Sequence, residues 1–449
     1  MQTARTFRPR LEVLEGRITP ATFNPISEAD LRNAVNTANG NDEADVIDLG
    51  GQTITLTAPM VGNNGLQIDL DSGDANNTLT IQNGTIERDP TAPLFRILNV
   101  NGPLNLSTMT IRNGLINSQD GGGVLISGTD AIVNINDSTI TNNRANIARG
   151  GGNGGGISVV GSGTLNLINS TVSGNTAEDE GGGIDINDGT NVAIYNSTIV
   201  NNTALTPRTG GGIFNESEST VISSSILANN VSEVGPDLFD ATEGSITVTD
   251  SLIETPGGHD FANAVDGNIV GQDPILGPLQ NNGGSTETHE LLDGSPAIDQ
   301  GNNNQNLAND QRGAGFARVA NGQADMGAFE VQVANNFFVV SQDPGPNGDA
   351  DPIVEVRNAD SSIRFTIQAY ESQFRGGVRV AKGDVNGDGV HDIITGAGRG
   401  GGPRVRVFDG RTGEALAGTL GSFFAFDESD RNGGFVAAGD VNNAGNDDV

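Results

Sequence analysis

The chain has 449 residues, 65 of them glycine and none cysteine, and its 56 acidic and 23 basic side chains give a formal charge of −33. This charge argues against nucleic acid as a partner, because phosphate binding requires clustered cations, and the lack of cysteine excludes disulfides. Hydrophobic residues still make up 35% of the chain and recur in register, so the sequence predicts a folded protein. It contains no run of 18 apolar residues, so we expect no membrane-spanning helix.

Residues 1–22 form a basic opening segment without the apolar stretch of a conventional signal peptide. The stretch from Leu14 to Arg17, followed by Thr19 and Pro20, resembles the arginine-rich leaders of large bacterial extracellular proteins, although Gly16 stands where a bulkier residue is usual. The resemblance implies a leader or sorting segment and an extracellular or cell-surface location.

Residues 27–39 predict an amphipathic helix with Ser27 as its N-cap. The apolar residues of one helical face are Leu31, Ala34, Val35 and Ala38. We expect this helix to cover the exposed N-terminal end of the fold that follows. Residues 45–58, DVIDLGGQTITLTA, then supply the first strands.

Between about residues 78 and 255 the sequence repeats itself. Seven short segments, from LTIQNG to DSLIET, each place an apolar residue third, at spacings of 26 to 32 residues. These residues are Ile81, Ile111, Ile140, Val172, Ile199, Ile226 and Leu252. Short β-branched strands at this period indicate a solenoid, because stacked coils hide an apolar face that one coil cannot hide alone. The segment therefore predicts a parallel β-helix.

Two polar features keep the same period. Three consecutive glycines precede an apolar residue at 121–123, 154–156, 181–183 and 210–212, and we expect each triplet to form a tight bend. Asn143, Asn175, Asn202 and Asn229 follow the apolar positions, and we predict that their amides form a ladder along the stack. The alternative is that these asparagines contact a ligand.

The stretch LRNAVNTAN followed by ADVIDL is similar to the opening of bacterial right-handed β-helix proteins, and the later repeats resemble those of polymorphic outer-membrane proteins. Residues 273–302, with DQRG at 310–313 and ADMGAFE at 324–330, closely resemble the segment that closes choice-of-anchor bacterial surface proteins. These resemblances imply a secreted, tethered protein. We place the right-handed parallel β-helix and its cap in residues 23–270, and the closing segment in 271–334.

Residues 335–449 contain a different repeat, in which Asp384 corresponds to Asp440, and this spacing of 56 suits a four-stranded propeller blade. The stretch DVNGDGVHD puts oxygen side chains at positions 1, 3, 5 and 9, around a turn at Gly389. They are Asp384, Asn386, Asp388 and Asp392, and the carbonyl of Val390 is the expected fifth ligand. Such oxygens converge on a hard cation, so we predict calcium here. The alternative is a simple acidic turn.

Position 12 of this loop is Thr395, which excludes an EF-hand, and strand-like residues follow it. The segment resembles the FG-GAP repeats of integrin-alpha-type propellers, whose loops bind calcium structurally. In the second copy Ala444 replaces the central carboxylate, so we leave that loop out of the predicted site. We interpret residues 335–449 as two FG-GAP-like repeats of a truncated, partial β-propeller, which makes the whole chain all-β apart from the capping helix.

Two functional classes remain. Parallel β-helices include polysaccharide lyases and glycoside hydrolases, and Asp185 and Asn215, which follow glycine triplets, would form a catalytic surface if they faced the same way. The other coil acids are scattered, and Tyr195 and Phe214 are the notable rings of the coils. We therefore expect no catalytic residue and favour a non-catalytic surface protein, adhesin-like or structural, with an extracellular glycan or another surface protein as partner. The alternative is an enzyme or binding module acting on extracellular polysaccharide.

Overall fold

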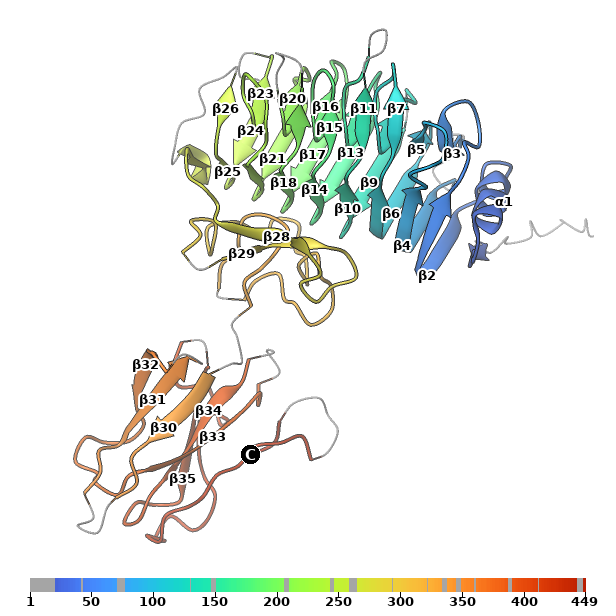
Figure 1. The fold of residues 1–449 in the computed structure, drawn as a ribbon. Helices are drawn as coiled ribbons and strands as arrows, with labels where there is room; N and C mark the ends of the chain where they lie inside the picture. Colours follow the sequence, from blue (N-terminus) through green and yellow to red (C-terminus); the bar gives the residue numbers. More distant parts are fainter. Residues whose placement is uncertain are drawn as a thin grey trace, which may run out of the picture. The chain divides into compact units, whose positions relative to one another are not determined.

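The computed structural model describes residues 21–41, 43–70, 77–129, 131–146, 151–205, 210–242, 246–257, 265–292, 294–320, 322–332, 337–344, 349–358, 361–386, 390–410, 412–441 and 447–449. The chain divides into two compact units, Met1–Val331 and Gln332–Val449, which we describe separately (Figure 1). Residues 1–20 of the predicted leader lie outside the described residues.

The first unit begins with the predicted cap. Helix α1 (Glu28–Ala38) starts at Ser27, whose hydroxyl accepts a hydrogen bond from the backbone N–H of Asp30 at 3.2 Å. Its buried residues are Leu31, Ala34, Val35 and Ala38, as predicted, and they join the core of the first coils at the end of the stack (Figure 1). No helix in the described ranges is long and apolar enough to cross a membrane.

A parallel β-helix follows, and its strands pair coil to coil in the same direction (Figure 1). The first strands are β1 (Thr22–Phe23), β2 (Asp45–Leu56), β4 (Leu79–Arg88) and β6 (Leu104–Arg112). The two halves of β6 pair with two different strands of the next coil, so one bent strand becomes two. One resulting side comprises β9 (Ile132–Asn136), β13 (Thr164–Ile168), β17 (Asn191–Tyr195), β21 (Thr220–Ser223) and β24 (Thr247–Thr249).

The other resulting side, which we term the covered sheet, comprises β10 (Thr139–Thr141), β14 (Thr171–Ser173), β18 (Thr198–Val200), β22 (Ile226–Ala228), β25 (Leu252–Ile253) and β27 (Ile269–Val270). A separate sheet comprises β3 (Asn64–Ile68), β5 (Arg96–Val100), β8 (Val124–Ile126), β12 (Ile157–Val159), β16 (Ile184–Ile186), β20 (Ile213–Asn215), β23 (Leu238–Asp240) and β26 (Pro256–Gly257). A short sheet comprises β7 (Leu115–Asn117), β11 (Arg144–Asn146), β15 (Thr176–Ala177) and β19 (Thr203–Ala204).

Apolar columns run along the inside of the stack, but three of the seven residues predicted to share one column lie elsewhere. The column consists of Ile86, Ile111, Ile140, Val172, Ile199, Leu227 and Ile253. Ile81 pairs with Leu106 instead, in another column. Ile226 and Leu252 stand one residue earlier, in register with Thr198.

The prediction placed Ile226 and Leu252 in the column in place of the residues that follow them, and this shift by one residue has a physical cause. Successive residues of a strand point to opposite faces, so Ile226 and Leu252 face outward when Leu227 and Ile253 face inward. Their outward face is also buried, because they pack with Met326 and Phe329 of the closing segment. Where both faces are covered, apolar character no longer tells which residue of a pair is inside.

The asparagine ladder exists, with one correction. The backbone N–H and the Nδ2 of Asn143 both donate to Oδ1 of Asn175 at 3.0 Å, and Asn175 contacts Asn202 in the same way. Asn202 then donates to Asn230 at 2.8 and 3.0 Å, so Asn229 was wrongly assigned. Asn229 lies on the preceding bend, at a φ of 56°.

A serine ladder, which the sequence did not reveal, stands at another bend. The backbone N–H of each serine but the last donates to the hydroxyl of the serine one coil on, at 3.0 to 3.2 Å, and the last donates to Asn268 at 3.1 Å. Its members are Ser138, Ser170, Ser197, Ser225 and Ser251. Each follows a residue with φ between 46° and 53°, so the bend and the ladder recur together.

The glycine triplets form the predicted bends. The first glycine of each has a φ between 62° and 72°. The second glycines stack on one another: a Cβ on Gly182 would lie 2.3 Å from the carbonyl oxygen of Gly211, and one on Gly155 would lie 2.4 Å from that of Gly182. Coils can approach this closely only without side chains.

The closing segment lies along the covered sheet (Figure 1). The short helix η1 (Val265–Gly267) lies just before the segment, which contains the antiparallel pair β28 (Leu276–Gln280) and β29 (Thr288–Leu291). Threonines of successive coils contact it: Thr139 donates to the carbonyl of Glu287 at 2.8 Å, and Thr198 accepts from the N–H of Ala328 at 3.0 Å. The segment is therefore part of the same unit as the coils.

The second unit consists of antiparallel sheets. The first comprises β30 (Phe337–Ser341), β31 (Ile353–Asn358) and β32 (Ile363–Gln368). The second comprises β33 (Val378–Gly383), β34 (Asp392–Ala397), β35 (Arg404–Phe408) and β36 (Ser422–Phe424), in sequential order. A four-stranded meander of this kind is the arrangement expected of one propeller blade.

Candidate metal-binding loop and buried polar network

The predicted calcium loop connects β33 to β34. The structure describes Asp384, Asn386, Val390 and Asp392, whereas Asp388 and its two flanking glycines lie outside the described residues. Asp392 is the first residue of β34, and its side chain is fully buried. The last predicted ligand is thus held by the sheet rather than by the loop.

The described part of the loop folds back on the Asp392 carboxylate. Oδ2 of Asp392 accepts a hydrogen bond from the N–H of Val385 at 3.2 Å, and Nδ2 of Asn386 lies 3.5 Å from its Oδ1. The structure therefore brings two of the predicted ligands, Asn386 and Asp392, side by side. Asp384 lies just before them, at the end of β33.

The second copy repeats this geometry 56 residues later. Oδ2 of Asp448 accepts from the N–H of Val441 at 3.2 Å, as Asp392 does from Val385. Asp448 also pairs with Gly439 as Asp392 pairs with Gly383. The two stretches are therefore repeats in structure as well as in sequence.

One acidic residue near the predicted site was missed by the sequence analysis. Asp447 accepts from the N–H of Asp384 at 2.9 Å and donates its own N–H to the Asp384 carbonyl at 2.7 Å. In the repeat alignment Asp447 falls opposite His391, so no motif marks it. The second loop thus packs against the first through backbone and carboxylate.

The donor types of the loop suit calcium: carboxylates, an amide and a carbonyl are the oxygens that this hard cation takes. In the described ranges no three carboxylates or histidines are gathered closely enough to hold a metal ion. Asp388, the predicted central ligand, lies outside those ranges. Calcium binding therefore stays a prediction, which the loop fits by donor chemistry.

On the coils, Asp185 and Asn215 do not face the same way. Asp185 pairs in register with Phe214, and Asn215 pairs with Ile186, so the two side chains point to opposite faces of the sheet. Oδ2 of Asp185 accepts from Ser158 and Asn187, each at 2.9 Å. Burial raises the pKa of Asp185 well above its ordinary value.

Asp137, another coil acid, lies at the edge of the covered sheet under the closing segment. Its carbonyl accepts from the Thr286 hydroxyl at 3.1 Å, and its carboxylate accepts from Asn169 at 2.6 Å. Burial raises the pKa of Asp137 to about 6. His289 is likewise structural: its ring nitrogens contact the Ser173 hydroxyl at 2.9 Å and the Gly277 carbonyl at 2.8 Å.

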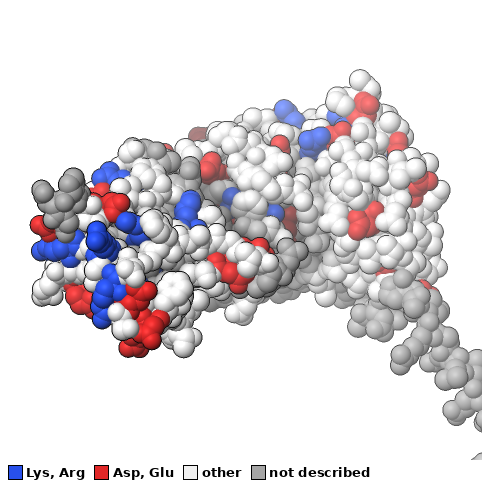
Figure 2. Space-filling model, turned by 90° about the horizontal axis from the view of Figure 1, so that it is seen from below, with Lys and Arg blue, Asp and Glu red and all other residues white. Residues whose placement is uncertain are grey.

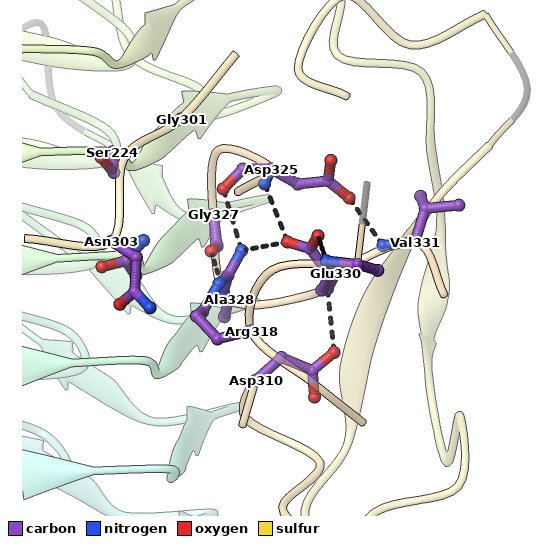
Figure 3. Close-up of polar contacts among 12 residues, drawn as sticks. Ser224, Gly301, Asn303, Asp310, Arg318, Asp325, Gly327, Ala328, Glu330 and Val331 are labelled. Carbon is purple, nitrogen blue, oxygen red and sulfur yellow. Dashed lines mark hydrogen bonds and ion pairs between the residues drawn. The ribbon is translucent and has the colours of Figure 1, made fainter. Parts of the chain in front are cut away.

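The closing segment holds a network of buried charges (Figure 3). The fully buried guanidinium of Arg318 donates to Oε2 of Glu330 at 3.0 Å and to the carbonyls of Asp325 and Gly327 at 2.9 Å. Glu330 also accepts from the N–H groups of Asp325 and Ala320, both at 2.8 Å. Burial raises the pKa of Glu330 to about 8, and the Arg318 charge opposes that rise.

A second ion pair extends this network. Asp310 binds Arg312 at 2.6 Å and accepts from the N–H of Glu330 at 2.9 Å. The Arg312 guanidinium stands between two rings, 4.0 Å from the centre of Phe316 and 3.8 Å from that of Phe329. The stretches DQRG and ADMGAFE thus contact each other and fold the closing segment onto the coils.

Each of the two units contains a match to a known protein family. Residues 65–253 match the family model described as "Right handed beta helix region", and residues 376–415 match the model described as "FG-GAP repeat". Neither the search of curated proteins nor that of solved structures gives a significant match.

We predict that Arg318→Met destabilises the first unit by about 3–5 kcal/mol, because it leaves Glu330 and the carbonyls of Asp325 and Gly327 buried without their shared donor. The double variant Arg318→Met/Glu330→Gln should lose less than the two single changes together. Urea denaturation followed by circular dichroism measures both. The matched control is Arg112→Met, which breaks the partly exposed pair with Glu87 and should cost under about 1 kcal/mol. Equal losses for Arg318 and Arg112 would contradict the prediction.

We predict that Asp185→Asn stabilises the first unit at about pH 8 and changes little at about pH 4. The folded protein holds the Asp185 proton above the pH at which the unfolded chain releases it, so the stability of the natural protein falls as pH rises from about 4. Asparagine mimics the protonated acid and removes that loss. Urea midpoints at the two pH values measure the effect, with the exposed Asp188→Asn as control. A variant that is less stable at the higher pH contradicts the prediction.

Proposed function

We propose that this chain, which contains a right-handed β-helix region followed by an FG-GAP repeat, is a non-catalytic extracellular or cell-surface protein with a scaffold or adhesin-like role. In this proposal the β-helix is a rigid support, and calcium stabilises the C-terminal module. An extracellular glycan or another surface protein is the partner class.

The main observation in favour of the scaffold role is that the closing segment packs over the outer face of the covered sheet. Its outward residues are not available to a polysaccharide chain, because Ile226, Leu252 and Val200 pack against the segment. Two coil acids also have structural contacts: Asp185 is buried and accepts hydrogen bonds from Ser158 and Asn187, and the Asp137 carbonyl accepts from the Thr286 hydroxyl.

The calcium role is supported by the repeated loop geometry. Val385 contacts Asp392 as Val441 contacts Asp448, so the described ends of the two acidic stretches are joined by the same hydrogen bond. The motif places Asp384, Asp388 and Asp392 within nine residues of the chain, and a divalent cation offsets the repulsion among such carboxylates. The formal charge of −33 is likewise suited to a calcium-containing extracellular medium.

Calcium should raise the melting temperature of the C-terminal transition by roughly 5 °C or more at saturating concentration, because a ligand that binds only the folded state stabilises it. Asp388→Ala should abolish the gain, since it removes the central charged ligand of the motif. Calorimetry of the full chain in calcium and in chelator measures the effect. The control is Asp349→Ala, which removes a carboxylate whose side chain is 73% exposed and should keep the gain. An unchanged melt in chelator excludes the calcium role.

The non-catalytic assignment is tested by incubating the purified protein with acidic and neutral polysaccharides. We expect no reducing ends and no unsaturated products above the blank. Product formation that Asp185→Asn or Asp137→Asn abolishes would instead establish an enzyme, with that carboxylate in its site.

A further inference from the structure

The C-terminal unit contains a cavity of about 280 Å³ that no role described above explains. All its lining residues come from one unit, between Tyr370 and Arg431. Ten of the 23 Lys and Arg residues of the chain follow Val331, and Figure 2 shows basic and acidic side chains intermixed on this unit. The cavity gathers both signs, with Arg404, Arg431, Glu371 and Glu428 in its lining.

Aromatic rings provide the apolar part of the cavity. Tyr370 and Phe374 pack edge to face, with ring centres 5.9 Å apart, and the single proton of the Tyr370 hydroxyl is shared between the carbonyls of Thr395 and Arg404, which lie 3.0 and 2.8 Å away. These contacts hold the ring against β34 and β35 and so fix the wall of the cavity. Phe424 on β36 lines the cavity and is 48% exposed, so part of its side chain is accessible to a ligand.

The charged groups are held in place by the chain itself. Arg404 donates from Nε to the Ser422 hydroxyl at 2.9 Å, and its Nη1 lies 3.6 Å from the Glu371 carboxylate. Arg431 donates from Nη1 to the carbonyls of Glu428 and Asp430. Neither Nη2 makes a hydrogen bond within the described ranges, so each guanidinium keeps donors for a ligand.

Glycines keep the cavity open. A Cβ on Gly401 would lie 2.6 Å from that of Ala397 and 2.9 Å from the Phe374 ring, so a side chain is not tolerated there. At Gly402, in contrast, a Cβ would meet only Arg431 at 3.7 Å and the Glu428 carbonyl at 3.9 Å. A larger side chain at Gly402 therefore has room to enter the cavity without disturbing the backbone.

The balance of charges indicates the kind of ligand. Two guanidinium groups and two carboxylates around aromatic rings offer donors and acceptors in equal measure, with a flat apolar surface between them. Sugar hydroxyls both donate and accept, and the C–H face of a pyranose ring packs on an aromatic ring. A polyanion would be repelled by Glu371 and Glu428 and by the charge of the whole chain.

We propose that this cavity binds a neutral hexopyranose unit of an extracellular glycan. The proposal rests on the adhesin-like function above and names the place where the glycan contact is made. Phe424 packs on the sugar ring, Arg404 and Arg431 donate to its oxygens, and Glu371 and Glu428 accept from its hydroxyls. The cavity volume of about 280 Å³ lies just below the range of about 300–1,000 Å³ that is usual for small-molecule sites, and it suits one sugar unit.

The test is ligand-observed NMR of the full-length protein with methyl α-mannoside, methyl β-galactoside and methyl β-glucoside, and with methyl β-glucuronide as the anionic counterpart. We expect binding of at least one neutral glycoside, little changed by salt because no net charge is neutralised. Phe424→Ala should weaken it about fivefold, and Arg431→Gln about tenfold. Gly402→Leu should abolish it by filling the cavity.

Matched controls are Phe435→Ala, which removes a phenylalanine that is 88% exposed outside the cavity, and Arg357→Gln, which removes a guanidinium paired with Glu355. Both should bind as the natural protein does. The proposal is overturned if no neutral glycoside binds, if the glucuronide alone binds, or if Gly402→Leu binds unchanged. Calcium stabilisation and the lack of catalysis are measured separately, so loss of this site leaves the scaffold proposal standing.

Discussion

The structure depends on one constraint: every coil must present its backbone and its bends to the next coil in the same register. The apolar columns alone do not impose this, because a slip of one residue exchanges the two faces of a strand. The polar bends do impose it. Asn175, Asn202 and Asn230 each receive two hydrogen bonds from the asparagine one coil before, and a slipped coil would leave those buried donors unpaired at a cost of about 1–3 kcal/mol each. Hydrophobic burial therefore favours stacking in general, and the polar ladders select one register between neighbouring coils.

The closing segment extends this logic to the outside of the stack. A flat sheet face that carries Ile226 and Leu252 would be an apolar patch if it stayed exposed. The segment buries that patch with Met326 and Phe329, and its own irregular backbone is satisfied by buried ion pairs and by threonine hydroxyls of the coils. A buried pair such as Arg318 and Glu330 adds little net stability, but it is costly to break and so favours one arrangement of the segment over others.

The sequence predicted the period, the cap, the glycine bends and most of the asparagine ladder, because each of these depends on residue types at fixed spacing. It misplaced Ile226, Leu252 and Asn229 by one residue. The closing segment buries the outer face through tertiary contacts, and such contacts cannot be read from the periodicity of the coil sequence. It missed the serine ladder because serine is common in this chain and its hydrogen bonds run to the backbone of another coil. In the predicted calcium loop, the motif identified Asn386 and Asp392 as neighbours, whereas Asp447 approaches from the other repeat and no spacing rule could place it.

These contacts also decide where recognition can take place. In the coils, the regularly spaced amides and hydroxyls bond to the neighbouring coil or to the closing segment, and a group that is already satisfied gains little by binding a ligand. In the C-terminal unit the sheets are short, loops are long, and arginines and phenylalanines reach a cavity whose wall is fixed by Tyr370. Repetition makes a surface uniform, and a uniform surface discriminates poorly between ligands. A protein built on stacked coils therefore gains specificity from the parts where the repeat is interrupted or replaced, which favours the C-terminal unit as the place of recognition.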